Sequence, residues 1–183
     1  MNARRRDLAL SLSIAAAAVV LHLFGDGVHT ALRYDRAGLL SGEVWRALTA
    51  HIVHVSWGHT ATNAIAALLI GALLPRERWS WLVAALGVTA GILAFERNVP
   101  TYAGLSGALH GVFAAGALRR FTKGDRLWGL GVAGLAIKLA YELWWGALPG
   151  SEAVAGAPVL VEAHLYGAMA GVGVYLVGAV RTR

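Results

Sequence analysis

The sequence predicts a single all-α membrane protein over residues 1–183, built from six transmembrane helices with both ends of the chain in the cytoplasm. Composition, a series of long apolar segments and the distribution of basic residues support this prediction. The chain is 57% hydrophobic and 14% charged, and its mean hydropathy is +0.59. Soluble domains carry about 25% charged residues, so the composition indicates a protein embedded in a membrane.

Six apolar segments succeed one another along the chain. A helix needs about 20 residues, range about 17–25, to cross the hydrocarbon core. The second segment is long enough only if its helix includes His59. The first follows three arginines, as a signal peptide would, but its apolar run exceeds the usual stretch of about 7–15 residues, which favours a retained span. The six segments are about Leu8–Phe24, Trp57–Leu74, Trp79–Phe95, Leu105–Phe121, Leu127–Leu148 and Val159–Val180.

The basic residues set the expected orientation, because lysine and arginine accumulate in cytoplasmic loops. With the N-terminus inside, eleven of them are cytoplasmic, namely Arg4, Arg5, Arg6, Arg76, Arg78, Arg119, Arg120, Lys123, Arg126, Arg181 and Arg183. Four lie outside, namely Arg33, Arg36, Arg46 and Arg97. Residues 25–56 form the one long loop, also outside, and their mixture of apolar and charged residues predicts a packed or membrane-dipping element of functional importance.

Two function classes are disfavoured by composition. The net charge of +6 does not indicate a nucleic-acid partner, because the basic residues flank apolar segments and form no face of their own. The absence of cysteine excludes a disulfide framework, a thiolate nucleophile and a cysteine-ligated zinc site. We expect no metal and no cofactor.

Polar residues recur at one predicted depth, near the outer starts of the second, fourth and sixth segments. His59 and Asn63 lie in the second, Ser106 opens the fourth with His110 one turn deeper, and His164 is about five residues into the sixth. Polar residues at membrane depth are costly and are usually functional. Taken singly, Ser106 could be a small packing residue, and His164 could form a hydrogen bond between helices. His59 and Asn63 could form a structural bridge on one helix face. Together they indicate an acyl-transfer site.

The expected chemistry follows from these residue types. Serine needs an adjacent base, so His164 would take the proton of Ser106 and return it to the leaving amine. The start of a helix favours an oxyanion, and His59 and Asn63 could add donors. No carboxylate adjoins these motifs in the sequence, which favours a catalytic dyad over a triad. Three carboxylates near the same membrane face leave a third member open: Glu96, Glu152 and Glu162.

Glycines predict how the two reactive side chains could meet. GxxxG pairs begin at Gly107 on the fourth segment and at Gly167 on the sixth. Small residues let membrane helices approach closely, so these two segments should touch one turn below His164. Gly104 and Gly107 bracket Ser106 and permit a sharp entry that exposes its hydroxyl.

The ordered set of motifs resembles the rhomboid intramembrane serine proteases over about Gly42 to Gly171. This resemblance implies a six-span core that cleaves transmembrane substrates near the outer face, with Ser106 as nucleophile and His164 as base. It implies an oxyanion hole of His59, Asn63 and the Ser106 amide, and structural roles for Arg46 and His54. The matching strings are Trp45-Arg46, His54, His59-x-x-x-Asn63, Gly104-x-Ser106-Gly107 and Ala163-His164-x-x-Gly167-x-x-x-Gly171.

The chain also resembles one subfamily, the rhombosortases. Many bacterial rhomboids have a tyrosine four residues after the serine, stacked on the catalytic histidine, whereas this chain has His110. That residue, the small size and the pairing of Lys138 with Glu142 in the fifth segment are similar to rhombosortases. The resemblance implies transmembrane substrates with a C-terminal Gly-Gly, helix and basic tail, cleaved in the bacterial inner membrane at its periplasmic face.

Several alternatives stay open at this point. His110 is either a packing residue, which we favour, or a second proton acceptor. Lys138 and Glu142 are spaced to pair along one helix face, and the structural interpretation is favoured over substrate-tail recognition or gating. The main rival function is a catalytically silent rhomboid-like protein that binds transmembrane clients. A small transporter using the same charged pair and the histidines is a more distant rival.

Overall fold

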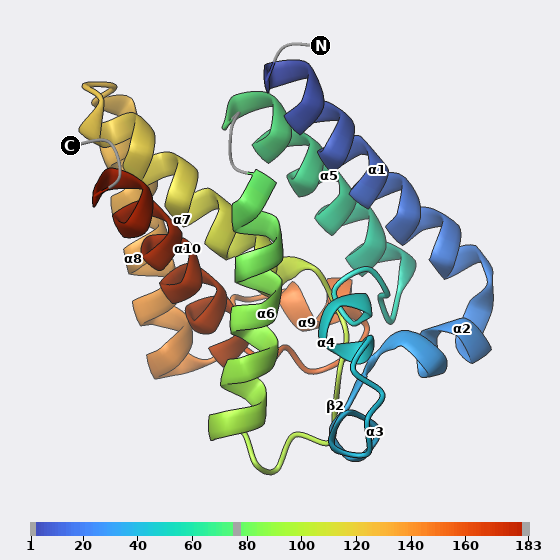
Figure 1. Ribbon diagram of the computed structural model, residues 1–183. Coiled ribbons are helices and arrows are strands. Elements are labelled where there is room, and N and C mark those ends of the chain that lie inside the picture. The colour runs from blue at the N-terminus through green and yellow to red at the C-terminus, as the bar shows by residue number, and fades with distance from the viewer. Residues whose placement is uncertain (1–2, 75–77, 181–183) are drawn as a thin grey trace.

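The computed structural model describes residues 3–74 and 78–180, with side chains from residue 5 onward (Figure 1). Four arginines used to predict the orientation lie outside it, namely the side chain of Arg4 and all of Arg76, Arg181 and Arg183. The described chain is all-helical apart from one antiparallel pair of two-residue strands, β1 (Tyr34–Asp35) and β2 (Thr101–Tyr102). The helices are α1 (Ala3–Leu23), α2 (Gly25–Leu32), α3 (Arg36–Leu40), α4 (Arg46–Thr49), α5 (Trp57–Leu73), α6 (Arg78–Phe95), α7 (Ser106–Thr122), α8 (Leu127–Trp145), α9 (Ser151–Ala155) and α10 (Glu162–Val180).

Each of the six predicted spans corresponds to one long helix. Three are long and apolar enough to cross a membrane by length and composition alone, within α1 (Arg5–Leu23), α6 and α10. Helices α5 and α7 are shorter, with 17 residues each. Helix α8 has 19 residues, but Lys138 and Glu142 reduce its apolar character. It ends three residues earlier than predicted, because Gly146 takes a φ of 84° that terminates the helix.

The long predicted loop is a packed element, as expected. It contains α2, β1, α3 and α4. Arg46 fastens it internally, since its Nη1 donates to the carbonyl oxygens of Thr30 and Arg33 at 2.9 and 2.8 Å, and its Nε donates to Glu43. This agrees with the structural role that the family resemblance implies for Arg46.

The long helices form one bundle with distinct ends (Figure 1). Helices α1 and α5 lie side by side, α10 packs against both α6 and α7, and α8 packs mainly on α7. The first turn of α1 and the last turn of α10 are at one end of the bundle, whereas α2, α3, α4 and α9 gather toward the other. The first turns of α5, α7 and α10 therefore meet at the end that holds the short helices.

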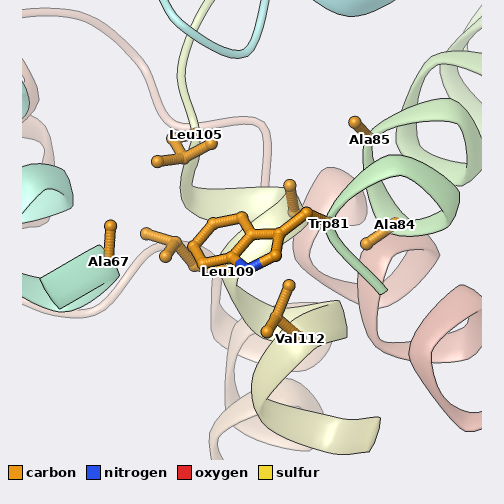
Figure 2. Packing of buried hydrophobic residues seen from close by; sticks show 8 residues of the cluster. Ala67, Trp81, Ala84, Ala85, Leu105, Leu109 and Val112 are labelled. Atoms are coloured by element: carbon orange, nitrogen blue, oxygen red, sulfur yellow. The ribbon is translucent and has the colours of Figure 1, made fainter. Parts of the chain in front are cut away.

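The bundle core is made of small side chains around one indole (Figure 2). Trp81 of α6 lies among Leu105, Leu109 and Val112, with Ala67 of α5 facing them. All of these side chains are buried, and Ala67 and Val112 are wholly so. The indole fills the space between α5, α6 and α7, so it fixes the helix that begins with Ser106.

Glycine gives α7 and α10 a backbone-to-backbone contact. A Cβ added at Gly167 would overlap the carbonyl oxygen of Gly107, and one at Gly171 would overlap that of Gly111. The two predicted GxxxG pairs therefore face each other, and the close approach expected from sequence is confirmed. This crossing lies one turn below His164.

Candidate active site

Ser106 and His164 meet at the end of the bundle that holds the short helices. Ser106 is the first residue of α7, and His164 lies in the first turn of α10. The Ser106 Oγ is 3.1 Å from the His164 Nε2, which is hydrogen-bonding distance. The His164 side chain is 7% exposed. A hydroxyl is thus held against a ring nitrogen that can accept its proton.

A carboxylate lies on the far side of this imidazole. The Oε2 of Glu142 is 2.8 Å from the Nδ1 of His164 and is also 2.6 Å from the Nζ of Lys138. The sequence favoured a dyad and left a third member open among Glu96, Glu152 and Glu162. The carboxylate that contacts His164 is none of these three but that of Glu142. Sequence adjacency could not reveal the contact, because Glu142 lies 22 residues before His164 and reaches it across a helix interface.

His110 stacks on one face of the His164 ring. The ring centroids are 4.2 Å apart and the ring planes differ by 16°. The Nδ1 of His110 is 2.7 Å from the carbonyl oxygen of Ser106, and because a carbonyl can only accept, this nitrogen carries the proton and donates. The geometry favours the packing interpretation of His110, since the ring holds the neighbouring imidazole in place from one side.

The two residues before Ser106 are held by α5 and by the first loop. Gly104 has a φ of 132°, and a Cβ there would lie 2.6 Å from the Cε1 of His59, so only glycine fits. The Leu105 amide donates to the Nε2 of His54 at 3.3 Å. Burial, reinforced by neighbouring histidines, lowers the pKa of His54 to about 3, which keeps this acceptor neutral. His54 is therefore structural, as the family resemblance implies.

The tyrosine of β2 completes this support. The hydroxyl of Tyr102 donates to the carbonyl oxygen of Gly104 at 2.9 Å, and the amide of Gly104 donates to the carbonyl oxygen of Ala50 at 2.9 Å. Burial raises the pKa of Tyr102 to about 12, so the hydroxyl stays a donor. The turn that presents Ser106 is thus tied to two other segments.

A cavity of about 750 Å³ opens beside these groups. Among its lining residues are His59, Asn63, Ser106, His110 and His164, so the structure brings the predicted site residues into one pocket. The Nδ2 of Asn63 and the Nδ1 of His59 are buried, and neither has a hydrogen-bond partner among the described residues. Buried polar groups without a partner are costly, so packing alone does not explain these two side chains.

A metal ion is disfavoured at this place. Donor atoms of His110, Glu142 and His164 lie within 4.8 Å of one another, a spacing that could hold an ion. The ammonium of Lys138, however, already contacts the same carboxylate oxygen and is 3.4 Å from the Nδ1 of His164. A bound cation would have to displace a fixed positive charge.

Comparison with known proteins identifies the chain. Its apolar spanning helices make it an integral membrane protein. Residues 41–181 match the family model described as Rhomboid domain, and the chain belongs to the rhomboid family, whose members are generally intramembrane serine proteases. No curated protein matches the chain.

Proposed function

We propose that the chain is an intramembrane serine endopeptidase that cleaves a peptide bond of membrane-anchored proteins near the outer face. The supporting observation is the 3.1 Å approach of the Ser106 Oγ to the His164 Nε2 at the wall of the 750 Å³ cavity. Family membership supports the proposal, because rhomboids are generally intramembrane serine proteases. The catalytic and oxyanion roles of individual residues belong to this proposal.

The reaction uses the two side chains in turn. His164 takes the hydroxyl proton as the Ser106 oxygen bonds to the scissile carbonyl carbon, and the carbonyl oxygen becomes an oxyanion. His164 then gives the proton to the leaving amine as the C–N bond breaks, leaving an acyl-enzyme. Water, deprotonated by the same imidazole, hydrolyses that ester and restores the serine.

Three groups stabilise the oxyanion in this mechanism. The amide at the start of α7 has no intrahelical acceptor and lies at the positive end of the helix dipole. Asn63 and His59 add side-chain donors from α5, in the same cavity wall. Donors fixed before the reaction cost no reorganisation when the negative charge develops.

We expect Asn63→Ala to lower kcat about 10²–10³-fold with little change in KM, because the lost donor acts on the transition state. Steady-state kinetics on a transmembrane reporter measure the effect. Thr62→Ala is the matched control, since Thr62 adjoins the same cavity but its hydroxyl bonds to its own helix at Gly58. Equal kcat values for the two variants would remove Asn63 from the oxyanion hole.

We also propose six spans with both chain ends in the cytoplasm and the site facing the periplasm of a bacterial inner membrane. The bundle supports this proposal, because α1 begins and α10 ends at the same end (Figure 1). The α7–α8 connection carries Lys123 and Arg126, in keeping with a cytoplasmic loop. Helices α5 and α7 are short for a full span. On this proposal, the packed first loop and the cavity occupy part of the outer leaflet above their first turns.

We propose that the substrates are those of a rhombosortase, namely proteins with a C-terminal Gly-Gly, a transmembrane helix and a basic tail. The support is His110, which stacks on His164 at the position where many bacterial rhomboids have tyrosine, together with the Lys138–Glu142 pair beside it. The alternative is a catalytically silent protein that binds transmembrane clients. The hydrogen-bonded serine and histidine favour the enzyme over this alternative.

A reporter experiment tests both levels of the proposal. A periplasmic domain followed by Gly-Gly, a transmembrane helix and a basic tail is co-expressed with the wild type or with Ser106→Ala, and the released domain is quantified. We expect release only with the wild type, and at least tenfold less when the reporter's Gly-Gly is replaced by Leu-Leu. Equal release from both reporters would reject the subfamily, whereas equal release by both enzymes would reject the protease. Altered reporter abundance without cleavage by either would favour the client-binding alternative.

A further inference from the structure

The carboxylate of Glu142 is shared between two partners on different helices. Its Oε2 is 2.6 Å from the Nζ of Lys138, one turn earlier on α8, and 2.8 Å from the Nδ1 of His164 on α10. The glutamate side chain is 2% exposed and the lysine side chain 29%. If the ion pair only stabilised α8, the contact between Lys138 and Glu142 would be enough. The additional contact between Glu142 and His164 therefore needs its own explanation.

The two possible partners of the His164 Nδ1 imply opposite tautomers. If the Nζ of Lys138 donated to it, the proton would reside on the Nε2, which faces Ser106 and must be free to act as base. If the Nδ1 donates to Glu142, the lone pair of the Nε2 faces the serine. The contact to the carboxylate is 2.8 Å and that to the ammonium is 3.4 Å, so the productive tautomer is the better bonded one.

We propose that Glu142 is a positioning residue that makes this site a Ser106–His164–Glu142 triad, and that Lys138 keeps its carboxylate ionised. The inference rests on the proposed protease function. Glu142 fixes the tautomer and orientation of the imidazole and stabilises the imidazolium that forms when the serine proton moves. Glu142 contacts the edge of the imidazole at its Nδ1, and His110 stacks on one face of the ring. Together they fix the orientation of the ring.

The charges balance throughout the reaction. Before it, the ammonium of Lys138 offsets the carboxylate of Glu142. In the tetrahedral intermediate, the new imidazolium of His164 offsets the oxyanion, and the site stays neutral. A carboxylate at membrane depth without the lysine would be expensive and would take up a proton, after which it could no longer stabilise the imidazolium.

The test uses the full purified chain in detergent with two readouts. One is kcat and KM on the Gly-Gly reporter, and the other is the rate at which a fluorophosphonate probe labels Ser106, which does not depend on the reporter. We expect Glu142→Gln to lower kcat and the labelling rate about 10²–10⁴-fold, with KM changed less than about twofold, because the amide no longer imposes the tautomer. Glu142→Asp should have a kcat and a labelling rate at least tenfold higher than those of Glu142→Gln. The values for Lys138→Met should lie between those of these two variants.

Glu96→Gln is the matched control, because Glu96 also accepts a hydrogen bond, from the Tyr166 hydroxyl, but is not among the residues that line the cavity. Wild-type kcat in Glu142→Gln, with Ser106→Ala inactive, would overturn the triad and leave the protease standing. Activity in both Ser106→Ala and His164→Ala would instead reject the protease itself. If Glu142→Gln fails to fold, Lys138→Met decides: a folded variant with wild-type kcat and labelling rate overturns the inference.

Discussion

Replacing Ser106 by alanine is expected to abolish labelling by a fluorophosphonate and to lower kcat on a transmembrane reporter by about 10⁶-fold. The loss is this large because the chemistry begins with the Ser106 oxygen bonding to the carbonyl carbon, and no other described hydroxyl adjoins the His164 Nε2. His164→Ala should cost nearly as much, since an unactivated serine is a poor nucleophile. The double variant should be no worse than either single one, because the two residues act as a unit.

Mass spectrometry of the labelled peptide measures this prediction directly. Ser151→Ala is the matched control, because Ser151 lines the same cavity and begins a helix but has no hydrogen bond to a histidine among the described residues. We expect wild-type labelling in Ser151→Ala. A probe adduct on Ser151 or on any residue other than Ser106 would contradict the assignment of the nucleophile.

Gly167→Ala is expected to lower both thermal stability and activity through one added methyl group. A Cβ at this position overlaps the carbonyl oxygen of Gly107, which is backbone and has no rotamer to change. Overpacking of this kind costs about 1–3 kcal/mol and pushes the two helices apart. Since Ser106 and His164 lie on these helices one turn away, a displacement of about 1 Å should cost about 10²-fold in kcat.

Gly173→Ala separates this packing effect from helix propensity. Gly173 lies on the same helix, and a Cβ there would meet nothing within 4 Å. Alanine is favoured over glycine in a helix by about 0.5–1 kcal/mol, so Gly173→Ala should leave activity unchanged and stability equal or higher. Melting temperatures in detergent and reporter kinetics compare the two variants. Two variants with the same melting temperature and kcat would show that the α7–α10 backbone contact does not hold the site.

The sequence predicted those parts of the molecule that depend on local pattern. The apolar segments located all six long helices. The GxxxG pairs at Gly107 and Gly167 predicted which two helices would touch, because small residues allow close helix packing. Residue type and common depth gathered His59, Asn63 and Ser106 into one pocket. Helix ends were less exact where a single glycine, Gly146, terminated α8 before its apolar run ended.

The role of Glu142 could not be derived in the same way. Its spacing from Lys138 predicted a pair along one helix, and that pair is present at 2.6 Å. Whether the pair also faces His164 depends on the rotation of α8 relative to α10, which no local pattern encodes. One feature of the sequence did indicate a functional role for Glu142. A carboxylate at membrane depth is energetically costly and is usually functional.

The backbone contact between α7 and α10 has a consequence for the timing of cleavage. Two helices that touch through glycine cannot separate without losing their packing, so the nucleophile and the base stay together while a substrate enters. Helix α8 is different, because it packs mainly on α7 and only slightly on α10. An outward swing of α8 would withdraw Glu142 and Lys138 while leaving Ser106 and His164 in place. On the proposed roles, we expect an enzyme with α8 moved outward to hydrolyse more slowly than one in which Glu142 contacts His164.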